Sequence, residues 1–246
     1  MEILRVYVTR LAGATDRIRA AARRASGGWR SAPVALMLAA ACAASFAAQR
    51  ILAGVEFRVG FPFDQPVLHA LGLHPALLFS EGFFWQPATY VFLHGSWLHL
   101  LCNALGLALF GRALEPGLGA RRFLALFFAG SIAGGILWAA CNGLWHLRTG
   151  ATMGLCVGAS GGVYGLVGAC AALFADRTLH VLVLFIPLRM RGKWLAVVVL
   201  LLTAADAALG LTKLAHAAHL GGFAAGWLLG RRWRRSFFEA EAADAL

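Results

Sequence analysis

The chain has 246 residues, of which 60% are hydrophobic and only 13% are charged, and its formal net charge is +11. Soluble domains carry roughly 25% charged residues, so this composition excludes an ordinary soluble domain and indicates a membrane protein. The positive charge does not indicate a nucleic-acid partner, because most of the basic residues flank apolar segments.

The first 31 residues carry seven arginines and form a basic arm ahead of the first apolar run. We predict that this arm is cytoplasmic, partly amphipathic and in contact with anionic lipid. The apolar run at 32–52 ends in small residues, as a signal peptide does. Because a leading arm of about 30 residues is too long for an ordinary signal peptide, we interpret this run as a retained helix.

Five further segments are predicted spans, since a bilayer core of about 30 Å needs roughly 20 apolar helical residues. They lie near 88–110, 123–144, 160–175, 194–211 and 215–230, and the fourth and sixth spans of the chain are short and glycine-rich. The apolar piece at 180–187 is too short to cross and predicts an interfacial element within a loop. Residues 231–246 form a predicted cytoplasmic tail with a disordered acidic end. The expected fold class is all-α, a polytopic bundle of six transmembrane helices in one domain at 32–230.

The distribution of lysine and arginine predicts the orientation, because these residues concentrate on the cytoplasmic side of membrane proteins. With the N-terminus inside, 18 of the 22 basic residues fall on inner segments, and the outer side holds Arg50, Arg58, Arg148 and Lys213. A missed or additional span would move every later loop to the opposite side of the membrane, so this split supports the six-span count. Both termini are therefore predicted to be cytoplasmic.

Polar side chains open the second, fourth and sixth spans, and all of them fall in the outer half of the bilayer because even-numbered spans run inwards. They are His94, His99, Asn103, Ser160, His216 and His219. Polar groups within hydrocarbon are costly and are functional candidates by default. Topology therefore brings residues far apart in sequence to one depth.

The stretch GASGGVYG at 158–165 places Ser160 among glycines, and a GxxxG pair, Gly161 and Gly165, lies in the fourth span. The sixth span has a matching series at 222, 226 and 230. Small residues at this spacing let membrane helices approach closely, and packing alone is the simpler explanation for them. A serine nucleophile also needs a base within about 2.6–3.2 Å. Because His219 lies at the depth of Ser160, we predict a Ser160–His219 dyad.

Three donors outline an oxyanion hole near this dyad. Ser160 opens a helix, where free backbone N–H groups favour negative charge. His99 and Asn103 are four residues apart and share a helix face, so their side chains supply further donors. His94 is about 140° from His99 on a continuous helix and is expected to fix the adjoining loop by hydrogen bonds. Asp206 is the one acidic candidate behind His219, and we prefer a dyad whose histidine is oriented by packing.

These residues resemble the motifs of the rhomboid intramembrane serine proteases in their six-span bacterial form. The pattern of two histidines and an asparagine is His94-x4-His99-x3-Asn103, and the GxSG motif is Gly158-Ala159-Ser160-Gly161. The AHxxGxxxG motif is Ala218-His219-x2-Gly222-x3-Gly226, and this register selects His219 as the base rather than His216.

The resemblance implies a rhomboid-like fold and a serine endopeptidase that cleaves single-span or other membrane-protein substrates within the lipid bilayer. It implies catalysis by Ser160 and His219, with Tyr164 stacked on His219. No cofactor or metal is expected, and the location implied is the bacterial inner membrane.

Two loops of the chain bear on this resemblance. The segment GRALEPGLGARRF looks like the family's loop between spans two and three, where Arg112, Glu115 and Gly119 are expected to hold structure. The first outer loop of the family often carries a Trp-Arg pair, whereas this chain has Trp85-Gln86. Residues 53–87 still suit an element half-sunk in the outer leaflet, and the anchoring of that loop is left open.

Two other functions remain as alternatives. An inactive relative on the same fold could bind membrane clients, but such relatives typically lack the serine or the histidine, and both are present here. A metal or proton carrier could use the membrane histidines, but zinc sites need three or four converging ligands. His94 and His99 are expected to diverge, and no carboxylate or cysteine pair accompanies them.

Overall fold

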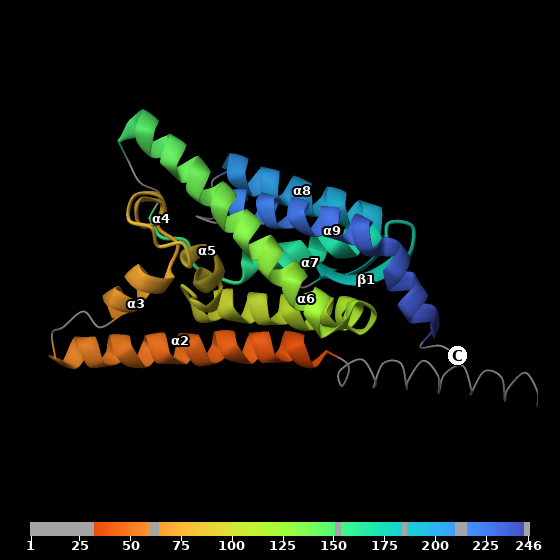
Figure 1. Ribbon diagram of the computed structural model, residues 1–246, viewed down its shortest axis with the longest axis horizontal. Helices are drawn as coiled ribbons and strands as arrows, with labels where there is room; N and C mark the ends of the chain where they lie inside the picture. Colours follow the sequence, from red (N-terminus) through yellow and green to blue (C-terminus); the bar gives the residue numbers. More distant parts are fainter. Residues whose placement is uncertain (1–31, 60–63, 151–153, 184–185, 210–215, 244–246) are drawn as a thin grey trace, which may run out of the picture.

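The computed structural model describes residues 32–59, 64–150, 154–183, 186–209 and 216–243, so the predicted basic arm at 1–31 lies outside the described residues. Helices make up most of the fold, and the all-α prediction is confirmed (Figure 1). The helices are α2 (Pro33–Val59), α3 (Asp64–Leu71), α4 (Pro75–Ser80), α5 (Gln86–Thr89), the 3-10 helix η1 (Tyr90–Phe92), α6 (Trp97–Thr149), α7 (Ser160–Leu173), α8 (Gly192–Leu209) and α9 (His216–Ala243).

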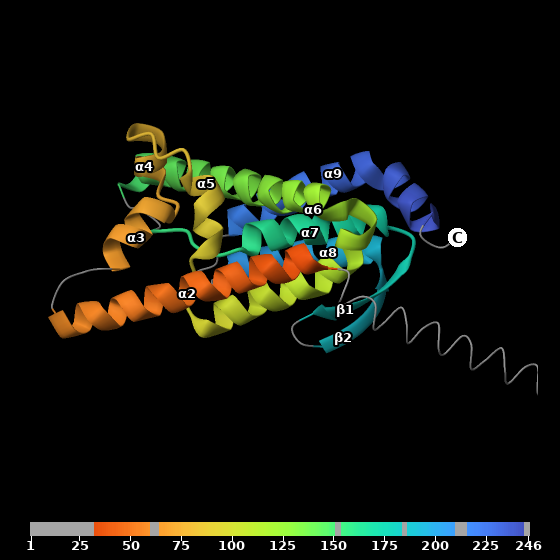
Figure 2. The same cartoon turned by 60° about the horizontal axis from the view of Figure 1, so that its bottom comes forward.

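Helix α6 contains the second and third predicted spans as two arms. At Gly119 the backbone leaves the helical region with φ of 72° and ψ of 162°, a conformation that glycine adopts without a Cβ penalty. The chain turns back there, and the yellow-green and green arms run away from a common end (Figures 1 and 2). By length and composition, α2 and α6 can cross a membrane, while α7 and the first part of α8 are shorter apolar helices.

The second span begins later than predicted, at Trp97 rather than at residue 88. Residues 86–92 instead form α5 and η1, and the side chain of Ser96 caps α6 by accepting from the backbone N–H of His99 at 3.1 Å. The mostly apolar run at 88–93 hides this boundary, because a short buried helix and a membrane helix have the same residue types.

Two further segments lie on the far side of the bundle from α3 and α4, and the second of them differs from prediction. The described part of the apolar piece, residues 180–183 and 186–187, belongs to two paired antiparallel strands, β1 (Thr178–Val183) and β2 (Ile186–Arg191) (Figure 2). Helix α9 continues to Ala243, so the disorder predicted for the acidic end is wrong for residues 236–243. Phe237 is 3% exposed, and its ring packs edge-on against the ring of Phe174 with the two centroids 5.5 Å apart. It fills the space that a side chain at position 117 would occupy, where the chain has Gly117.

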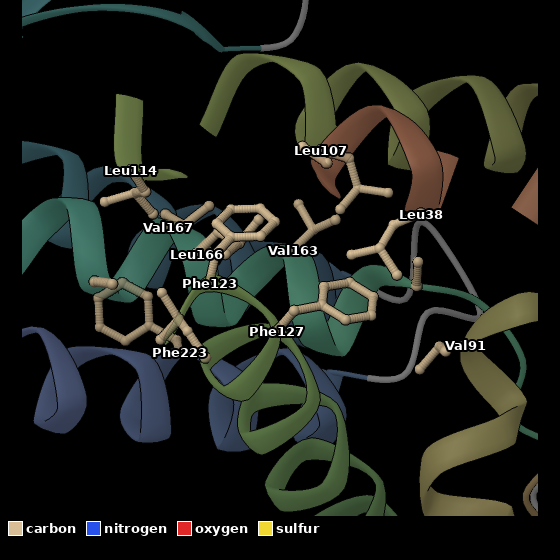
Figure 3. Close-up of a cluster of buried hydrophobic side chains, with 14 of the residues drawn as sticks. Leu38, Val91, Leu107, Leu114, Phe123, Phe127, Val163, Leu166, Val167 and Phe223 are labelled. Carbon is tan, nitrogen blue, oxygen red and sulfur yellow. The ribbon is translucent and has the colours of Figure 1, made fainter. Parts of the chain in front are cut away.

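Helix α7 forms the centre of the bundle, and 12 of its 14 residues are buried. Apolar side chains from α2, η1, both arms of α6 and α9 gather around apolar side chains of α7 itself (Figure 3). These labelled side chains are Leu38, Val91, Leu107, Leu114, Phe123, Phe127, Val163, Leu166, Val167 and Phe223. The nucleophile candidate therefore sits at the end of the most enclosed element.

Helices α7 and α9 meet through the glycines that the sequence singled out. A Cβ on Gly222 would overlap the carbonyl oxygen of Gly161, and one on Gly226 would overlap that of Gly165. On the other side of α7, the Cα of Gly165 lies 3.0 Å from a Cβ built on Gly130 of α6. The predicted close approach of the fourth and sixth spans is confirmed, and it depends on the absence of side chains.

Glu115 joins the turn of α6 to the first span. Its two carboxylate oxygens accept from the backbone N–H groups of Val34 at 2.9 Å and Ala35 at 3.0 Å, in the first turn of α2. These N–H groups have no partner within the helix, and a carboxylate at a helix N-terminus is favourable. Glu115 is 4% exposed and has the structural role that the resemblance implied.

Candidate active site

The hydroxyl of Ser160 and the imidazole of His219 form a hydrogen bond between two helices, with 2.9 Å between Oγ and Nε2. Ser160 is the first residue of α7, and His219 lies in the first turn of α9. The glycine interface between these helices brings their starts to one level. A serine hydroxyl becomes a nucleophile when a base lies within about 2.6–3.2 Å, so the pair has the reach that acyl transfer requires.

The ring of Tyr164 supports the imidazole of His219 from one side. The two rings stack with centroids 4.1 Å apart and an interplanar angle of 5°. His219 is 5% exposed, so this packing restricts its orientation. Asp206 lies on α8, but its side chain is outside the described residues. His216 is the first residue of α9, and it is His219 that bonds to Ser160.

His99 and Asn103 lie beside Gly158, two residues before Ser160. Gly158 has a φ of +116°, and a Cβ there would lie 2.6 Å from Nε2 of His99 and 3.6 Å from Nδ2 of Asn103. Asn103 is 4% exposed, and its Nδ2 has no hydrogen-bond partner in the part of the chain that the structure describes. A buried donor of this kind is available to a ligand, and together with the N–H of Ser160 it outlines a site for an oxyanion.

His94 differs from its prediction because it precedes α6 instead of lying on it. The helical angle therefore does not apply, and the rings of His94 and His99 make an edge contact with centroids 5.2 Å apart. Neither ring nitrogen of His94 has a hydrogen-bond partner among the described residues, although the side chain is buried. Its backbone N–H, which donates to Oε1 of Gln49 at 3.1 Å, is what ties this loop to α2.

Sequence reasoning missed Tyr90, which supports the loop before Ser160. Its carbonyl oxygen accepts from the N–H of Gly158 at 3.0 Å, and its hydroxyl donates to the carbonyl oxygen of Ser131 at 3.0 Å. Tyr90 is 1% exposed, and its hydroxyl fills the space beside Gly161. A tyrosine within an apolar run gives no local signal, because its partners are backbone groups distant in sequence.

A family model described as the rhomboid domain matches residues 81–236, a segment that includes Ser160 and His219. The chain belongs to the rhomboid family. The match covers 156 of the 246 residues of the chain. The helical bundle described above is consistent with this rhomboid assignment.

Named rhomboid proteins from distant organisms are similar to this chain. "RHOMBOID-like protein 5" of Arabidopsis thaliana is 31% identical over 168 residues, which cover 67% of this chain and 49% of that protein. "Rhomboid protein 1, mitochondrial" of Saccharomyces cerevisiae is 34% identical over 142 residues, 56% of this chain and 39% of that protein. "Rhomboid-like protease 5" of Toxoplasma gondii is 31% identical over 175 residues, 68% of this chain and 19% of that protein. The matched region spans about half or less of these relatives.

Proposed function

We propose that the protein is an intramembrane serine protease that cleaves transmembrane segments of membrane-protein substrates near the outer face, using Ser160 and His219 as a catalytic dyad. The observation that carries this proposal is the 2.9 Å hydrogen bond between Oγ and Nε2 of two residues 59 positions apart. Its setting at two glycine-packed helix starts, beside the buried Nδ2 of Asn103, which has no hydrogen-bond partner among the described residues, supports a reactive pair over a merely structural one.

In the first step, Nε2 of His219 takes the proton of the Ser160 hydroxyl as Oγ attacks the substrate carbonyl. A tetrahedral intermediate forms, and negative charge develops on the former carbonyl oxygen. The side chains of His99 and Asn103 and the backbone N–H of Ser160 donate to that oxygen, and such donors act most strongly in the transition state.

In the second step, the intermediate collapses and His219 gives its proton to the leaving amine, so that the first product departs and an ester to Ser160 remains. Water then attacks this ester, with His219 again as the base, and hydrolysis restores the free hydroxyl. The stacked ring of Tyr164 keeps the imidazole in place through both proton transfers.

The length of α7 supports cleavage below the membrane surface. Its 14 residues span about 21 Å, whereas the bilayer core is about 30 Å thick. A nucleophile at one end of this helix therefore lies within the membrane when the other end reaches the opposite surface. A helical substrate shields its peptide bonds, so we expect cleavage where small or helix-breaking residues allow local unwinding.

The charge distribution supports the orientation that this function uses. Eighteen of the 22 basic residues fall on the side of the N-terminus, so both termini face the cytoplasm and the site opens to the outer leaflet. For a protein of the six-span bacterial type, the location we propose is the inner membrane.

The test uses purified protein in liposomes with a single-span model substrate. Ser160→Ala should abolish cleavage, because it removes the nucleophile and little packing. Ser131→Ala is the matched control, since Ser131 is also buried but bonds the carbonyl of Phe127 in its own helix, and it should retain parental activity. Cleavage by Ser160→Ala at the parental rate would refute the proposal, as would binding of the substrate without any Ser160-dependent cleavage.

A further inference from the structure

The loop that leads into Ser160 is paired with the first outer loop. Leu73 and Cys156 form an isolated antiparallel bridge in which each backbone N–H donates to the carbonyl oxygen of the other at 3.0 Å. Two residues later, the N–H of Gly158 donates to Tyr90. Because His99 and Asn103 face Gly158, the position of Leu73 bears directly on the wall of the oxyanion site.

Gln86 clamps the backbone on both sides of Leu73. Its Nε2 donates to the carbonyl oxygen of His69 at 2.9 Å, and its Oε1 accepts from the N–H of His74 at 3.0 Å. The side chain is fully buried, at 0% exposure. It thus bridges the end of α3 and the start of α4, and holds the turn that presents Leu73 to Cys156.

The chemistry of this clamp requires an amide. One group must donate to a carbonyl and the other must accept from an N–H, and glutamine supplies both from one planar end. Arginine has five donors and no acceptor, so the family's frequent Trp-Arg pair could not accept from the N–H of His74. In this chain, the amide of Gln86 therefore anchors the first outer loop in a way that arginine could not.

The hydrogen bonds of the neighbouring side chains Trp85 and Thr89 do not hold the backbone on both sides of Leu73. Nε1 of Trp85 donates to the carbonyl oxygen of Ala70 at 2.7 Å, and Oγ1 of Thr89 donates to that of Leu71 at 2.8 Å. Both fasten the last turn of α3, before Leu73. Gln86 alone among these three side chains holds the backbone on either side of the bridge.

We propose that Gln86 is a positioning residue of the proteolytic site, which holds the loop at 156–158 in the register that the oxyanion donors require. This inference rests on the proposed function. It predicts a loss of kcat rather than of substrate affinity, because the donors that the loop aligns act in the transition state.

The kinetic test compares Gln86→Met, which keeps the length and apolar body but removes both hydrogen bonds, with Thr89→Val as the matched control. Gln86→Met should lower kcat by about tenfold or more with KM within about twofold, since small misplacement of an oxyanion donor is costly. Gln86→Glu keeps the acceptor for His74 and should fall between Gln86→Met and the parent. Parental kcat in Gln86→Met, or a raised KM alone, would overturn the proposal.

A second readout is independent of catalysis. The Cys156 thiol is 5% exposed, and burial raises its pKa to about 12, so it holds little thiolate at pH 8. In a background lacking the exposed Cys102 and Cys141, a charged methanethiosulfonate should label Cys156 slowly. Gln86→Met should raise that labelling rate by about tenfold or more, and Thr89→Val should not.

The two readouts separate the possible failures. Reduced kcat in Gln86→Met without faster labelling of Cys156 would refute the idea that Gln86 acts through the loop at 156–158. A Cys156→Ala variant serves as the control that identifies the labelled thiol. Absence of Ser160-dependent cleavage in the parent would defeat the proposed function and the catalytic role of Gln86 with it. The labelling rates would then still decide whether Gln86 holds this loop. Thermal unfolding of each variant shows that the compared proteins are folded.

Discussion

The register between α7 and α9 can be tested by adding one methyl group, in the substitution Gly222→Ala. A Cβ at Gly222 overlaps the carbonyl oxygen of Gly161, the residue next to the nucleophile, and also lies 3.2 Å from the carbonyl oxygen of Gly130. Both neighbours are backbone, so neither can rotate away. Relieving the overlap requires the helices to separate by roughly 1 Å to reach ordinary contact distances.

A separation of this size is large compared with the tolerance of the dyad. Oγ of Ser160 and Nε2 of His219 are 2.9 Å apart, near the middle of the range of about 2.6–3.2 Å in which a base can take the proton. A misplacement of about 1 Å can lower the rate by about 100-fold. We therefore expect Gly222→Ala to lower kcat by about 100-fold and, through overpacking, to destabilise the fold by about 1–3 kcal/mol.

The assay is turnover of the model substrate in liposomes, accompanied by thermal unfolding. Gly143→Ala is the matched control, because Gly143 is also a helical glycine and a Cβ there meets no atom within 4 Å. It should retain parental kcat and gain up to about 1 kcal/mol from improved helix propensity. Parental kcat in Gly222→Ala would show that the register of α7 and α9 does not limit catalysis and would refute this reasoning.

Four further substitutions test other parts of the structure. His219→Ala should reduce cleavage to the level of Ser160→Ala, whereas His216→Ala should retain most activity, and the reverse pattern would mean that His216 is the base. Asn103→Ala should lower kcat by about 10–1000-fold, toward the lower end because other donors can compensate, with KM little changed; a raised KM at normal kcat would place Asn103 in substrate binding. Phe237→Ala should lower the free energy of unfolding by about 3 kcal/mol in denaturant titrations, because it empties a buried site, and an unchanged midpoint would contradict the docking of the C-terminal part of α9.

The sequence by itself determined the features that depend on local pattern. Hydropathy over about 20 residues located the apolar helices, because membrane helices must satisfy their backbone internally and cover it with apolar side chains. Glycines four residues apart predicted where α7 and α9 touch, and the resemblance to the AHxxGxxxG motif selected His219. The pairing of Ser160 with a histidine far along the chain followed from topology, since helix starts on one side of a membrane share a depth.

Tertiary structure decided what depends on contacts between distant segments. His94 was misplaced because the mostly apolar run at 88–93 does not reveal that this part of the chain is a short helix, and that α6 begins only after Ser96. The acidic end of the chain looked disordered by composition, yet Phe237 finds a slot beside Gly117 and Phe174 that no local pattern encodes.

The clamp of Gln86 belongs to the same class, since its partners are backbone groups of a turn whose position is set by the fold. Every residue has a backbone N–H and C=O, so sequence spacing cannot tell which of them a buried amide will meet. Only the packing of the first outer loop against the loop before Ser160 brings those groups within hydrogen-bond distance of Gln86.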